Sequence, residues 1–358
     1  MVLPLDSPPD SLCILRLSAV GDISHTLPIV RTLQAAWPRT RLTWIIGRTE
    51  HGLVYDIPGI EFITFDKSKR WRSYAQVRRA LRGRRFDVLL HMQMSLRASI
   101  ASLMVAADVR LGFDRDRAKD LQWLFTNARI APGGRQHVID SFFGFTEALG
   151  IAEHVLRWDI PIPDEARAFA EHELPGDQPT LVISPCSSMA YRNWNAAGYA
   201  AVADHAVERH GMRVVLSGGP SAIEAQYARD IAAAARAPLV NLIGRTDLKQ
   251  LLALLTRADA LIAPDAGPAH LATAVGTPVV GLYATTNPDR ARPYLSAEWV
   301  INRYSEAVQA KYGKLPDELP WGTRVRDPGT MDRITPEDVI AKLDALLAQR
   351  RGDATGPG

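Results

Sequence analysis

The chain has 358 residues, 47% of them hydrophobic and 23% charged, and a formal net charge of +3. At roughly 150 residues per domain, this length suggests two domains. Such an apolar sequence can bury enough surface to offset its chain entropy, which excludes disorder for most of it. Its 25 glycines follow no triplet period and it has only two cysteines, so collagen-like and disulfide-scaffold proteins are excluded. The near-neutral charge excludes a protein that binds polyanions over its whole surface.

The cysteines and the apolar stretches indicate the compartment. Cys13 and Cys186 are far apart, and each lies in an apolar run, so we expect two reduced, buried thiols in a cytosolic protein. Residues 1–10 contain no basic region followed by an apolar core, and no signal peptide is predicted. The best apolar stretch, 98–109, is too short to cross a bilayer. A soluble protein that can still touch a membrane surface is expected.

Short apolar runs alternate with longer amphipathic segments in the first half of the chain. Strands are expected at residues 12–17, 42–46, 61–65, 87–91 and 109–113. Helices are expected at residues 25–36, 71–82, 97–107 and 137–149. Continuous apolar strands that alternate with helices are typical of a parallel sheet covered on both faces.

A segment rich in proline and acidic residues, 157–179, interrupts this alternation and is interpreted as the linker. The alternation then restarts, with strands expected at residues 180–184, 213–217, 240–243, 260–263 and 279–283. Helices are expected at residues 196–209, 222–235, 248–256, 268–275 and 336–349, and fraying from 351 onward.

The pattern predicts an α/β protein with two doubly wound, Rossmann-like domains and a cleft between them. The expected domains are residues 1–160 and 179–350, joined by a linker at 161–178, and the last helix could pack back on the first domain. In such sheets ligands bind beyond the carboxyl ends of the strands.

Several nucleotide and metal motifs are absent. No GxGxxG follows the first strand and no GxxxxGK[ST] occurs, which weakens dinucleotide redox chemistry and P-loop phosphotransfer. No HExxH or CxxC occurs either, so no bound metal is expected. Asp114 and Asp116 offer two carboxylates for a divalent ion, but cations surround them. We favour a solvated turn there.

Small and polar residues follow the first expected strand, in the run from residue 15 to residue 28. Gly21 permits a tight turn, which places Asp22 at the carboxyl end of the strand, facing the expected cleft. A carboxylate in that position can accept a proton from a substrate hydroxyl. The alternative is that Asp22 only caps the helix that follows. The residues alone favour neither.

The densest group of small and polar residues lies at residues 263–278, where a strand ends and a helix begins near Pro268. The N–H groups and positive dipole end of such a helix, beside Gly267, can hold a diphosphate. Asp265 is interpreted as an acceptor for sugar hydroxyls or turn amides. His270 lies on the first turn and can reach an anion, although a lone helical histidine is more often structural.

A third group follows the first strand of the second half. The hydroxyls of Ser187 and Ser188 and the guanidinium of Arg192 suit phosphate oxygens. The alternative is a helix cap beside a surface arginine.

Residues 67–85 carry cations without a single acid, and Trp71 and Tyr74 lie among them. The cations are Lys67, Lys69, Arg70, Arg72, Arg78, Arg79, Arg82, Arg84 and Arg85. Because like charges at this density repel, an anionic partner explains them better than a solvated helix face. No RNA-binding motif is present, which favours an anionic membrane or glycolipid over nucleic acid.

Three motifs together resemble the ADP-heptose:lipopolysaccharide heptosyltransferases of glycosyltransferase family 9, which have the GT-B fold. They are SAVGDISHTLP at residues 18–28, SSxxxRxW at 187–194 and DAGPAHLA at 265–272. The resemblance covers nearly the whole chain. It is nearest to heptosyltransferase I, because the basic segment at residues 69–72 looks like that enzyme's acceptor-binding segment.

The resemblance implies inverting transfer of a heptose from ADP-heptose to a Kdo hydroxyl of the lipopolysaccharide inner core, with no cofactor. Asp22 takes the family's role of general base. Donor contacts are implied at Ser187, Ser188, Arg192, Glu224, Thr246, Asp265, Gly267 and His270. Acceptor contacts are implied at Arg70, Arg72, Arg97 and Lys119.

The resemblance implies three partners: ADP-heptose, the anionic precursor Kdo-lipid A and the inner-membrane surface. It implies no nucleic acid, and a cytoplasmic enzyme that is peripheral on that membrane.

Three alternative functions stay open. One is a related GT-B enzyme with another nucleotide sugar, such as another core glycosyltransferase. Another is a nucleotide-sugar epimerase or hydrolase, and the third is a non-catalytic glycolipid- or RNA-binding protein. Residues 302–328, with Trp321, depart from shorter family members and leave the acceptor open.

Overall fold

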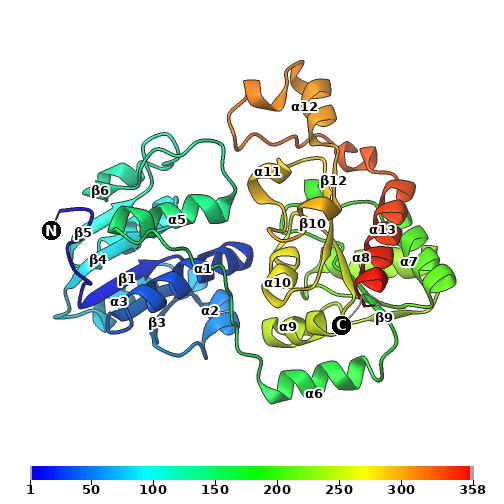
Figure 1. Ribbon diagram of the computed structural model, residues 1–358, viewed down its shortest axis with the longest axis horizontal. Helices are drawn as coiled ribbons and strands as arrows, with labels where there is room; N and C mark the ends of the chain where they lie inside the picture. Colours follow the sequence, from blue (N-terminus) through cyan, green and yellow to red (C-terminus); the bar gives the residue numbers. More distant parts are fainter. Residues whose placement is uncertain (1, 355–358) are drawn as a thin grey trace. The chain divides into compact units, whose positions relative to one another are not determined.

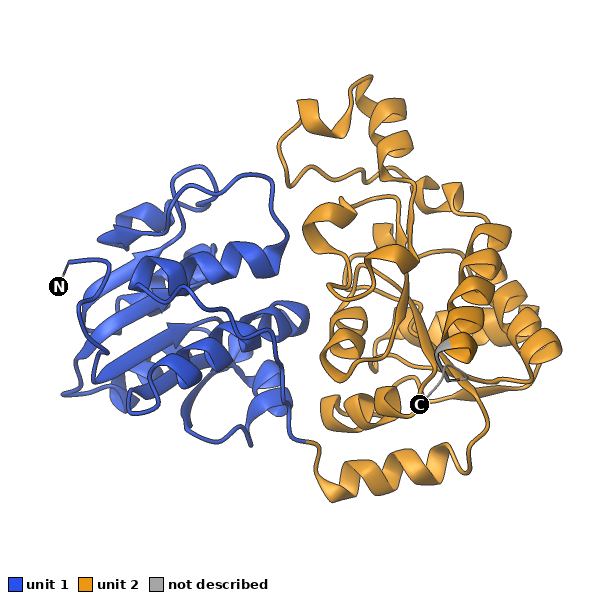
Figure 2. Ribbon diagram, in the orientation of Figure 1, with its two compact units in different colours: residues 1–161 blue, residues 162–358 orange. Residues whose placement is uncertain are grey.

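Parallel pairing defines the architecture: in the computed structural model, which describes residues 2–354, the named strands form two parallel sheets of six strands each (Figure 1). The chain divides between Pro161 and Ile162 into two units, with one sheet in each (Figure 2). The predicted α/β, doubly wound architecture is confirmed for both units.

The sheet of the first unit has the strand order β3-β2-β1-β4-β5-β6. Its strands are β1 (Ser11–Leu15), β2 (Arg41–Gly47), β3 (Ile60–Phe65), β4 (Phe86–His91), β5 (Ala107–Gly112) and β6 (Ala128–Arg129). Its α-helices are α1 (Val20–Ala36), α2 (Arg48–Val54), α3 (Trp71–Ala80), α4 (Leu96–Ser102) and α5 (Val138–Leu149). Two short 3-10 helices, η1 (Lys67–Lys69) and η2 (Gln122–Leu124), follow β3 and β5.

The sheet of the second unit has the order β12-β11-β10-β7-β8-β9. Its strands are β7 (Thr180–Ile183), β8 (Arg213–Leu216), β9 (Leu239–Asn241), β10 (Ala260–Pro264), β11 (Val279–Tyr283) and β12 (Val300–Asn302). Its helices are α6 (Asp164–Glu173), α7 (Ala196–His210), α8 (Ala222–Ala234), α9 (Leu248–Thr256), α10 (Gly267–Val275), α11 (Pro288–Ala291), α12 (Tyr304–Tyr312) and α13 (Pro336–Ala354), with 3-10 helix η3 (Ala190–Arg192) before α7.

Each sheet has a topological switch point at its centre. β1 pairs with both β2 and β4, and β7 pairs with both β8 and β10. The loops that leave the two central strands at a switch point run in opposite directions, which opens a place for a ligand at the carboxyl edge. The switch points therefore select the loops after β1, β4, β7 and β10 as site candidates.

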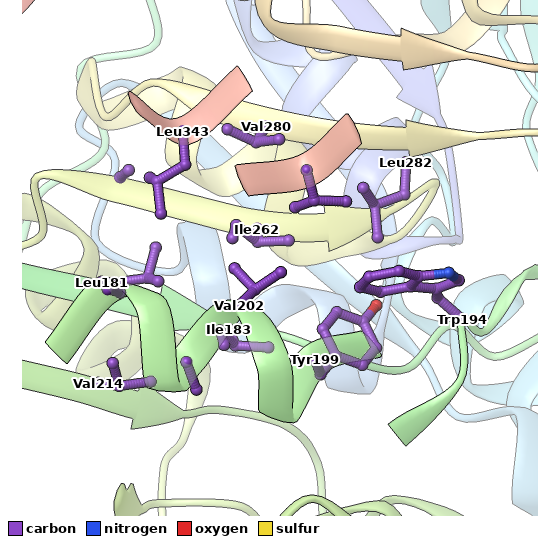
Figure 3. Close-up of a cluster of buried hydrophobic side chains, with 14 of the residues drawn as sticks. Leu181, Ile183, Trp194, Tyr199, Val202, Val214, Ile262, Val280, Leu282 and Leu343 are labelled. Carbon is purple, nitrogen blue, oxygen red and sulfur yellow. The ribbon is translucent and has the colours of Figure 1, made fainter. Parts of the chain in front are cut away.

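The core of the second unit lies between the sheet and helices α7 and α13 (Figure 3). Trp194 is fully buried there, its ring packs edge-on to Tyr199 at 5.0 Å, and its indole N–H donates to the carbonyl of Ile334 at 3.0 Å. Leu343 of α13 contributes to the same core. The last helix thus packs on the sheet of its own unit.

Some predicted boundaries are wrong. The expected helix at 97–107 ends at Ser102, and Ala107 already begins β5, because the apolar stretch contains both elements without a period that separates them. The expected linker contains α6, which packs on α9. Helix α1 begins at Val20, five residues before the expected start at 25.

The two thiols behave as the sequence predicts. Cys13 and Cys186 are both free and buried. Burial raises the pKa of the Cys13 thiol, and it raises the pKa of Cys186 to about 12. Neither sulfur is a thiolate near neutral pH, which leaves both as small hydrophobic groups. Across the described residues, the helices also lack the combination of length and hydropathy needed to span a bilayer.

Helix α13 is held to α7 by a polar clasp. Nε2 of His205 and Nε2 of His210 lie 2.8 and 2.6 Å from the same oxygen of Asp344. Nη2 of Arg351 lies 3.4 Å from Nδ1 of His210. Because a guanidinium only donates, this contact places the proton of a neutral imidazole on Nε2, facing Asp344. Burial raises the pKa of Asp344, but the two imidazole hydrogen bonds outweigh it and hold the pKa below its usual value.

Replacing Asp344 by Asn is expected to weaken this clasp. The side chain is 42% exposed, so solvent screens the pair and we expect a loss of only about 1 kcal/mol in the free energy of unfolding near pH 6. A lowered native pKa stabilises the fold above the unfolded value of about 3.9, and this stabilisation disappears as the pH falls through the native value. Urea titrations should therefore show the gap between wild type and Asp344→Asn closing toward pH 3. An unchanged gap there, or an equal loss in the exposed control Asp177→Asn, would contradict the clasp.

Candidate active site

The candidate donor site lies at the carboxyl edge of the second sheet. Ser187, Ser188 and Arg192 follow β7, whereas Asp265 and His270 follow β10, on the other side of the switch point. The structure thus brings together the two loops that the sequence motifs singled out.

An ion pair joins these two loops. Nη1 of Arg192 lies 3.2 Å from a carboxylate oxygen of Asp265 and donates to its backbone carbonyl at 3.0 Å. Nε2 of His270 lies 3.9 Å from the other carboxylate oxygen. All three side chains are largely buried. Burial raises the pKa of Asp265, but His270, Arg192 and a hydrogen bond from Thr286 outweigh it and leave the pKa below its ordinary value. Asp265 is therefore an ionised anchor that orients Arg192.

Helix α10 supplies a second positive feature beside this pair. Gly267 is its first residue and Pro268 its second, as the sequence predicts. The N-cap residue is Ala266, and no side chain caps the helix there. The backbone N–H groups and the positive end of the helix dipole therefore stand next to Arg192, an arrangement that suits a diphosphate.

Ser187 and Ser188 differ in their surroundings. Ser187 is buried, its N–H donates to Oδ1 of Asn193 at 2.7 Å, and its hydroxyl accepts from the N–H of Met189 at 3.3 Å. Ser188 is exposed. The Ser187 hydroxyl thus stabilises the turn before η3, and Ser188 has the more accessible hydroxyl.

Glu224 and Thr246 lie beyond β8 and β9, at the outer half of the same edge. The carboxylate of Glu224 accepts from the N–H of Gly219 at 2.7 Å and from the hydroxyl of Ser221 at 2.5 Å, while the Ser221 hydroxyl caps α8. Thr246 is half-buried and precedes Asp247, the N-cap of α9. The same edge of the sheet carries both residues, although none of the contacts described above joins them to Arg192 and Asp265.

Arg326 is a site residue that sequence reasoning missed. Its guanidinium lies over the ring of Tyr191 at 5.6 Å from the centroid, and that of Arg192 lies over the same ring at 5.7 Å. The segment 302–328 reaches this position because Val325 donates to the carbonyl of Thr285, just after β11, at 3.0 Å. The segment that departs from the family pattern thus adds a cation on the same ring that Arg192 contacts. Its sequence carries no motif that could have shown this.

Asp22 lies in the first turn of α1, at the switch point of the first sheet. One carboxylate oxygen pairs with Nη2 of Arg16 and accepts from the N–H of Ala19 at 3.2 Å, and the side chain is 36% exposed. Asp22 therefore caps the start of α1, as the alternative interpretation predicted, but its carboxylate is still accessible to solvent. Gly21 is the second residue of the helix, so the expectation that it makes the turn is wrong: residues 16–19 make it.

Arg16 was not singled out from the sequence, although a cation inside an apolar strand run was the available signal. Its side chain is only 8% exposed, Nη1 donates to the carbonyl of Met92 at 2.5 Å, and the guanidinium lies over Phe142 at 5.3 Å. Since Arg16 is fixed on three sides, it fixes the direction of the Asp22 carboxylate.

The four implied acceptor residues are exposed at the carboxyl edge of the first sheet, which is also the edge of Asp22. Arg70 and Arg72 flank the start of α3, Arg97 is the second residue of α4, and Lys119 lies in the loop after β5. The density of free charge in residues 67–85 is lower than the sequence suggests. The partners of Lys67, Arg84 and Arg85 are Glu50, Glu61 and Asp108.

The possible metal ligands lie elsewhere. Within residues 2–354, the one group of three or more side chains that could bind a metal is the clasp of His205, His210 and Asp344. The positive guanidinium of Arg351 lies beside His210 and disfavours a bound cation there. The expected turn is present at residues 115–117 and Asp116 is exposed, but Asp114 is buried and the guanidinium of Arg117 binds it where a metal was considered.

A groove of about 510 Å³ opens in the first unit, lined by Ser11, Arg41, Glu61 and Phe86 among others. These residues lie at the amino ends of β1 to β4. The groove is therefore at the opposite edge of the sheet from Asp22, and it holds none of the predicted site residues.

Comparison with known proteins identifies the class. The family model described as glycosyltransferase family 9 (heptosyltransferase) matches residues 74–318. The lipopolysaccharide core heptosyltransferase OpsX of Haemophilus influenzae is 41% identical over 338 residues, which are 94% of this chain and 97% of that one. A glycosyltransferase family 9 structure from Veillonella parvula superposes with a TM-score of 0.78 at 22% identity, covering 95% of this chain and 98% of that one. The Escherichia coli heptosyltransferase WaaC, solved with ADP, superposes with a TM-score of 0.71 at 19% identity, covering 94% and 99%.

The protein is thus a glycosyltransferase with the GT-B fold, as the resemblance implied. It belongs to glycosyltransferase family 9, the heptosyltransferase family. The narrower likeness to heptosyltransferase I is not shown: lipopolysaccharide heptosyltransferase 1 of Pseudomonas aeruginosa is 23% identical over 357 residues, covering 93% of this chain and 97% of that one.

Removing the charge of Asp265 should leave Arg192 buried and unpaired. We expect Asp265→Asn to lower the free energy of unfolding by about 3 kcal/mol, the cost of breaking a buried pair. The double variant Arg192→Met, Asp265→Asn should recover part of this loss, because no unpaired charge remains. Urea titration of the three proteins near pH 7 measures both values. A single variant no less stable than Asp177→Asn would show that the pair does not anchor the two loops.

Proposed function

We propose that this enzyme transfers a heptose from ADP-heptose to the Kdo and inner-core region of a lipopolysaccharide precursor, with inversion at the anomeric carbon. The observation that carries the proposal is the cluster of Arg192, His270 and the uncapped start of α10 around a buried Asp265. The printed names of the relatives support the choice of substrates, since OpsX is a lipopolysaccharide core heptosyltransferase and WaaC was solved with ADP.

The donor half of the reaction belongs to the second unit. The diphosphate of ADP-heptose binds to Arg192, His270 and the N–H groups at Gly267, with Ser188 as a hydroxyl contact. Thr246 and Glu224 lie along the same edge, where the adenosine would extend. As the bond between the anomeric carbon and the phosphate oxygen breaks, negative charge grows on that oxygen, and the same cations stabilise it.

The acceptor half belongs to the first unit. Asp22 accepts the proton of a Kdo hydroxyl while that oxygen attacks the anomeric carbon from the face opposite ADP. The bond to ADP breaks as the new glycosidic bond forms, through an oxocarbenium-like state related to that of glycosidases, and the configuration inverts. Arg16 fixes the direction of the carboxylate through their ion pair. The reaction requires that water is excluded from the donor, because water would otherwise hydrolyse it.

The exposed cations at the carboxyl edge of the first sheet are suited to an anionic acceptor. Arg70, Arg72, Arg97 and Lys119 can contact the carboxylates of Kdo and the phosphates of lipid A. Such an acceptor lies in a membrane, which favours a peripheral enzyme on the cytoplasmic face of the inner membrane. The cations also favour this acceptor over the small substrates of an epimerase or hydrolase.

Asp22→Asn tests the assignment of the base. The variant keeps the shape of the side chain but cannot take a proton, so we expect turnover to fall by roughly 10²–10⁴-fold. The stabilisation of the protein by ADP should not change, because the donor residues lie in the other unit. Release of ADP from ADP-heptose with a Kdo-containing acceptor gives the rate, and thermal melts with ADP give the control. A near-normal rate would remove Asp22 from the mechanism.

Titration with ADP tests the donor site. We expect Arg192→Ala to weaken ADP binding by roughly 10–100-fold, as loss of a charge-assisted hydrogen bond does. Arg326→Ala should weaken it by about fivefold through lost charge and lost packing on Tyr191. The exposed Arg333→Ala is the matched control and should bind ADP normally. Calorimetric titration measures all three, and equal affinities for Arg192→Ala and Arg333→Ala would place the diphosphate elsewhere.

A further inference from the structure

Four large apolar side chains are exposed at the carboxyl edge of the first sheet, where the proposed function uses only Asp22 and cations. They are Trp71, Leu96, Leu121 and Leu124, exposed by 74%, 55%, 58% and 60%. Each follows a strand of the first sheet: Trp71 begins α3 after β3, Leu96 begins α4 after β4, and the other two lie in the loop after β5. Because these strands are parallel, the segments that follow β3, β4 and β5 all lie at the carboxyl edge of the sheet. We call these four side chains the apolar edge.

Printed contacts tie the members of the apolar edge together. The ring of Trp71 lies 5.6 Å from that of Tyr74, and the Tyr74 hydroxyl lies 3.4 Å from the carbonyl of Arg97, next to Leu96. The N–H of Leu96 donates to Asp120 at 3.2 Å, next to Leu121. The four side chains therefore belong to one neighbourhood of the surface and are not scattered.

The backbone in this neighbourhood is strained. Of the four non-glycine residues with positive φ in residues 2–354, three lie here: Arg70 at 45°, Asp120 at 51° and Leu121 at 57°. A left-handed conformation costs an ordinary residue roughly 1–2 kcal/mol. Such strain persists where the surrounding structure enforces it, and it gathers at functional sites. Here it lies directly before Trp71 and at Leu121, two of the four exposed side chains.

The charges around the apolar edge are positive and largely unpaired. Lys69, Arg70 and Arg72 form no ion pair among the described residues. The neighbouring acids are engaged instead. Asp66 accepts from Ser68 and pairs with Arg48, which lowers its pKa to about 2, and Asp120 accepts from Leu96. This edge therefore combines protruding apolar groups with cations that lack protein partners.

We infer that the apolar edge inserts into the surface of an anionic phospholipid bilayer while the surrounding cations bind its headgroups. Tryptophan favours the membrane interface, leucine gains by burial among acyl chains, and each nearby lysine or arginine adds electrostatic attraction. Aliphatic leucines offer nothing to RNA, which stacks its bases on aromatic rings. The inference deepens the proposed function, since a lipid-anchored acceptor would be met at this same edge.

Vesicle co-sedimentation of the full chain tests the inference. We expect the protein to bind vesicles of phosphatidylethanolamine with phosphatidylglycerol, to bind vesicles of phosphatidylcholine alone much more weakly, and to lose binding at high salt. Leu121→Ser and Leu124→Ser should each reduce the partition onto anionic vesicles by about fivefold, because each removes an inserted apolar group. Trp71→Ser should reduce it at least as much.

Leu103→Ser is the matched control. Leu103 has the same type of side chain in the same unit and is 59% exposed, but it directly follows α4, toward the opposite edge of the sheet. This variant should bind vesicles as the wild type does. Equal losses in Leu103→Ser and Leu121→Ser, or wild-type binding by both Leu121→Ser and Leu124→Ser, would overturn the inference. So would binding of a single-stranded RNA oligonucleotide by a protein that does not bind the vesicles.

Leu121→Gly separates docking from folding. Glycine adopts the left-handed conformation without strain, so this variant should melt at the same temperature as the wild type or above it, yet bind vesicles about fivefold more weakly. A lower melting temperature with unchanged vesicle binding would show that Leu121 serves the fold instead.

Transfer of heptose to a deacylated, water-soluble acceptor distinguishes this inference from the proposed function. Leu121→Ser and Leu124→Ser should retain that transfer, because the soluble acceptor needs no bilayer. If the wild type transfers no heptose at all, the proposed function fails while the vesicle result stands on its own. If transfer proceeds and the variants still bind vesicles normally, only the docking surface fails.

Discussion

The pair of Arg192 and Asp265 is the interaction on which the donor site depends. A buried carboxylate is costly unless a cation and hydrogen bonds compensate it, and here the compensating cation comes from the loop on the other side of the switch point. The pair therefore ties the loop after β7 to the loop after β10. It also holds Arg192 beside the start of α10, so that the attraction for a diphosphate is assembled before any ligand arrives.

The first unit repeats this arrangement with the roles exchanged. At its switch point a nearly buried arginine, Arg16, fixes a more accessible carboxylate, Asp22. In the second unit the acid is the anchor and the arginine is offered to the ligand, whereas in the first unit the arginine is the anchor and the acid is offered. Both pairs use the same physics: an ion pair restricts the rotamers of the functional group, which prepares one unit for an anion and the other for a proton.

The sequence predicted those parts of the fold and site that depend on local patterns. Helix α9 was predicted with its observed bounds, and the structure adds the capping pair of Asp247 and Gln250 at its start. Residues 97–107 were assigned wrongly, because a continuous apolar run fits both a helix and a strand. The loops carrying Asp22 and Asp265 were predicted because strand, turn and helix start are adjacent in the sequence. The contact of Arg326 with Tyr191 depends on an antiparallel bridge between Thr286 and Arg324, which no local pattern indicates.

Segment 302–328 and the loop near Leu121 differ in how well their residues fit the conformation of the chain. The segment builds a small core of its own from Tyr304, Val308 and Val325, and that core fixes the stretch that carries Arg326. At Leu121 the opposite holds, because glycine or asparagine would fit the backbone better than leucine. A fold selected for stability alone would not keep an exposed leucine in a left-handed conformation. The exposed side chain of Leu121 suits the bilayer contact proposed above, and Lys69, Arg70 and Arg72 at the same edge suit an anionic surface.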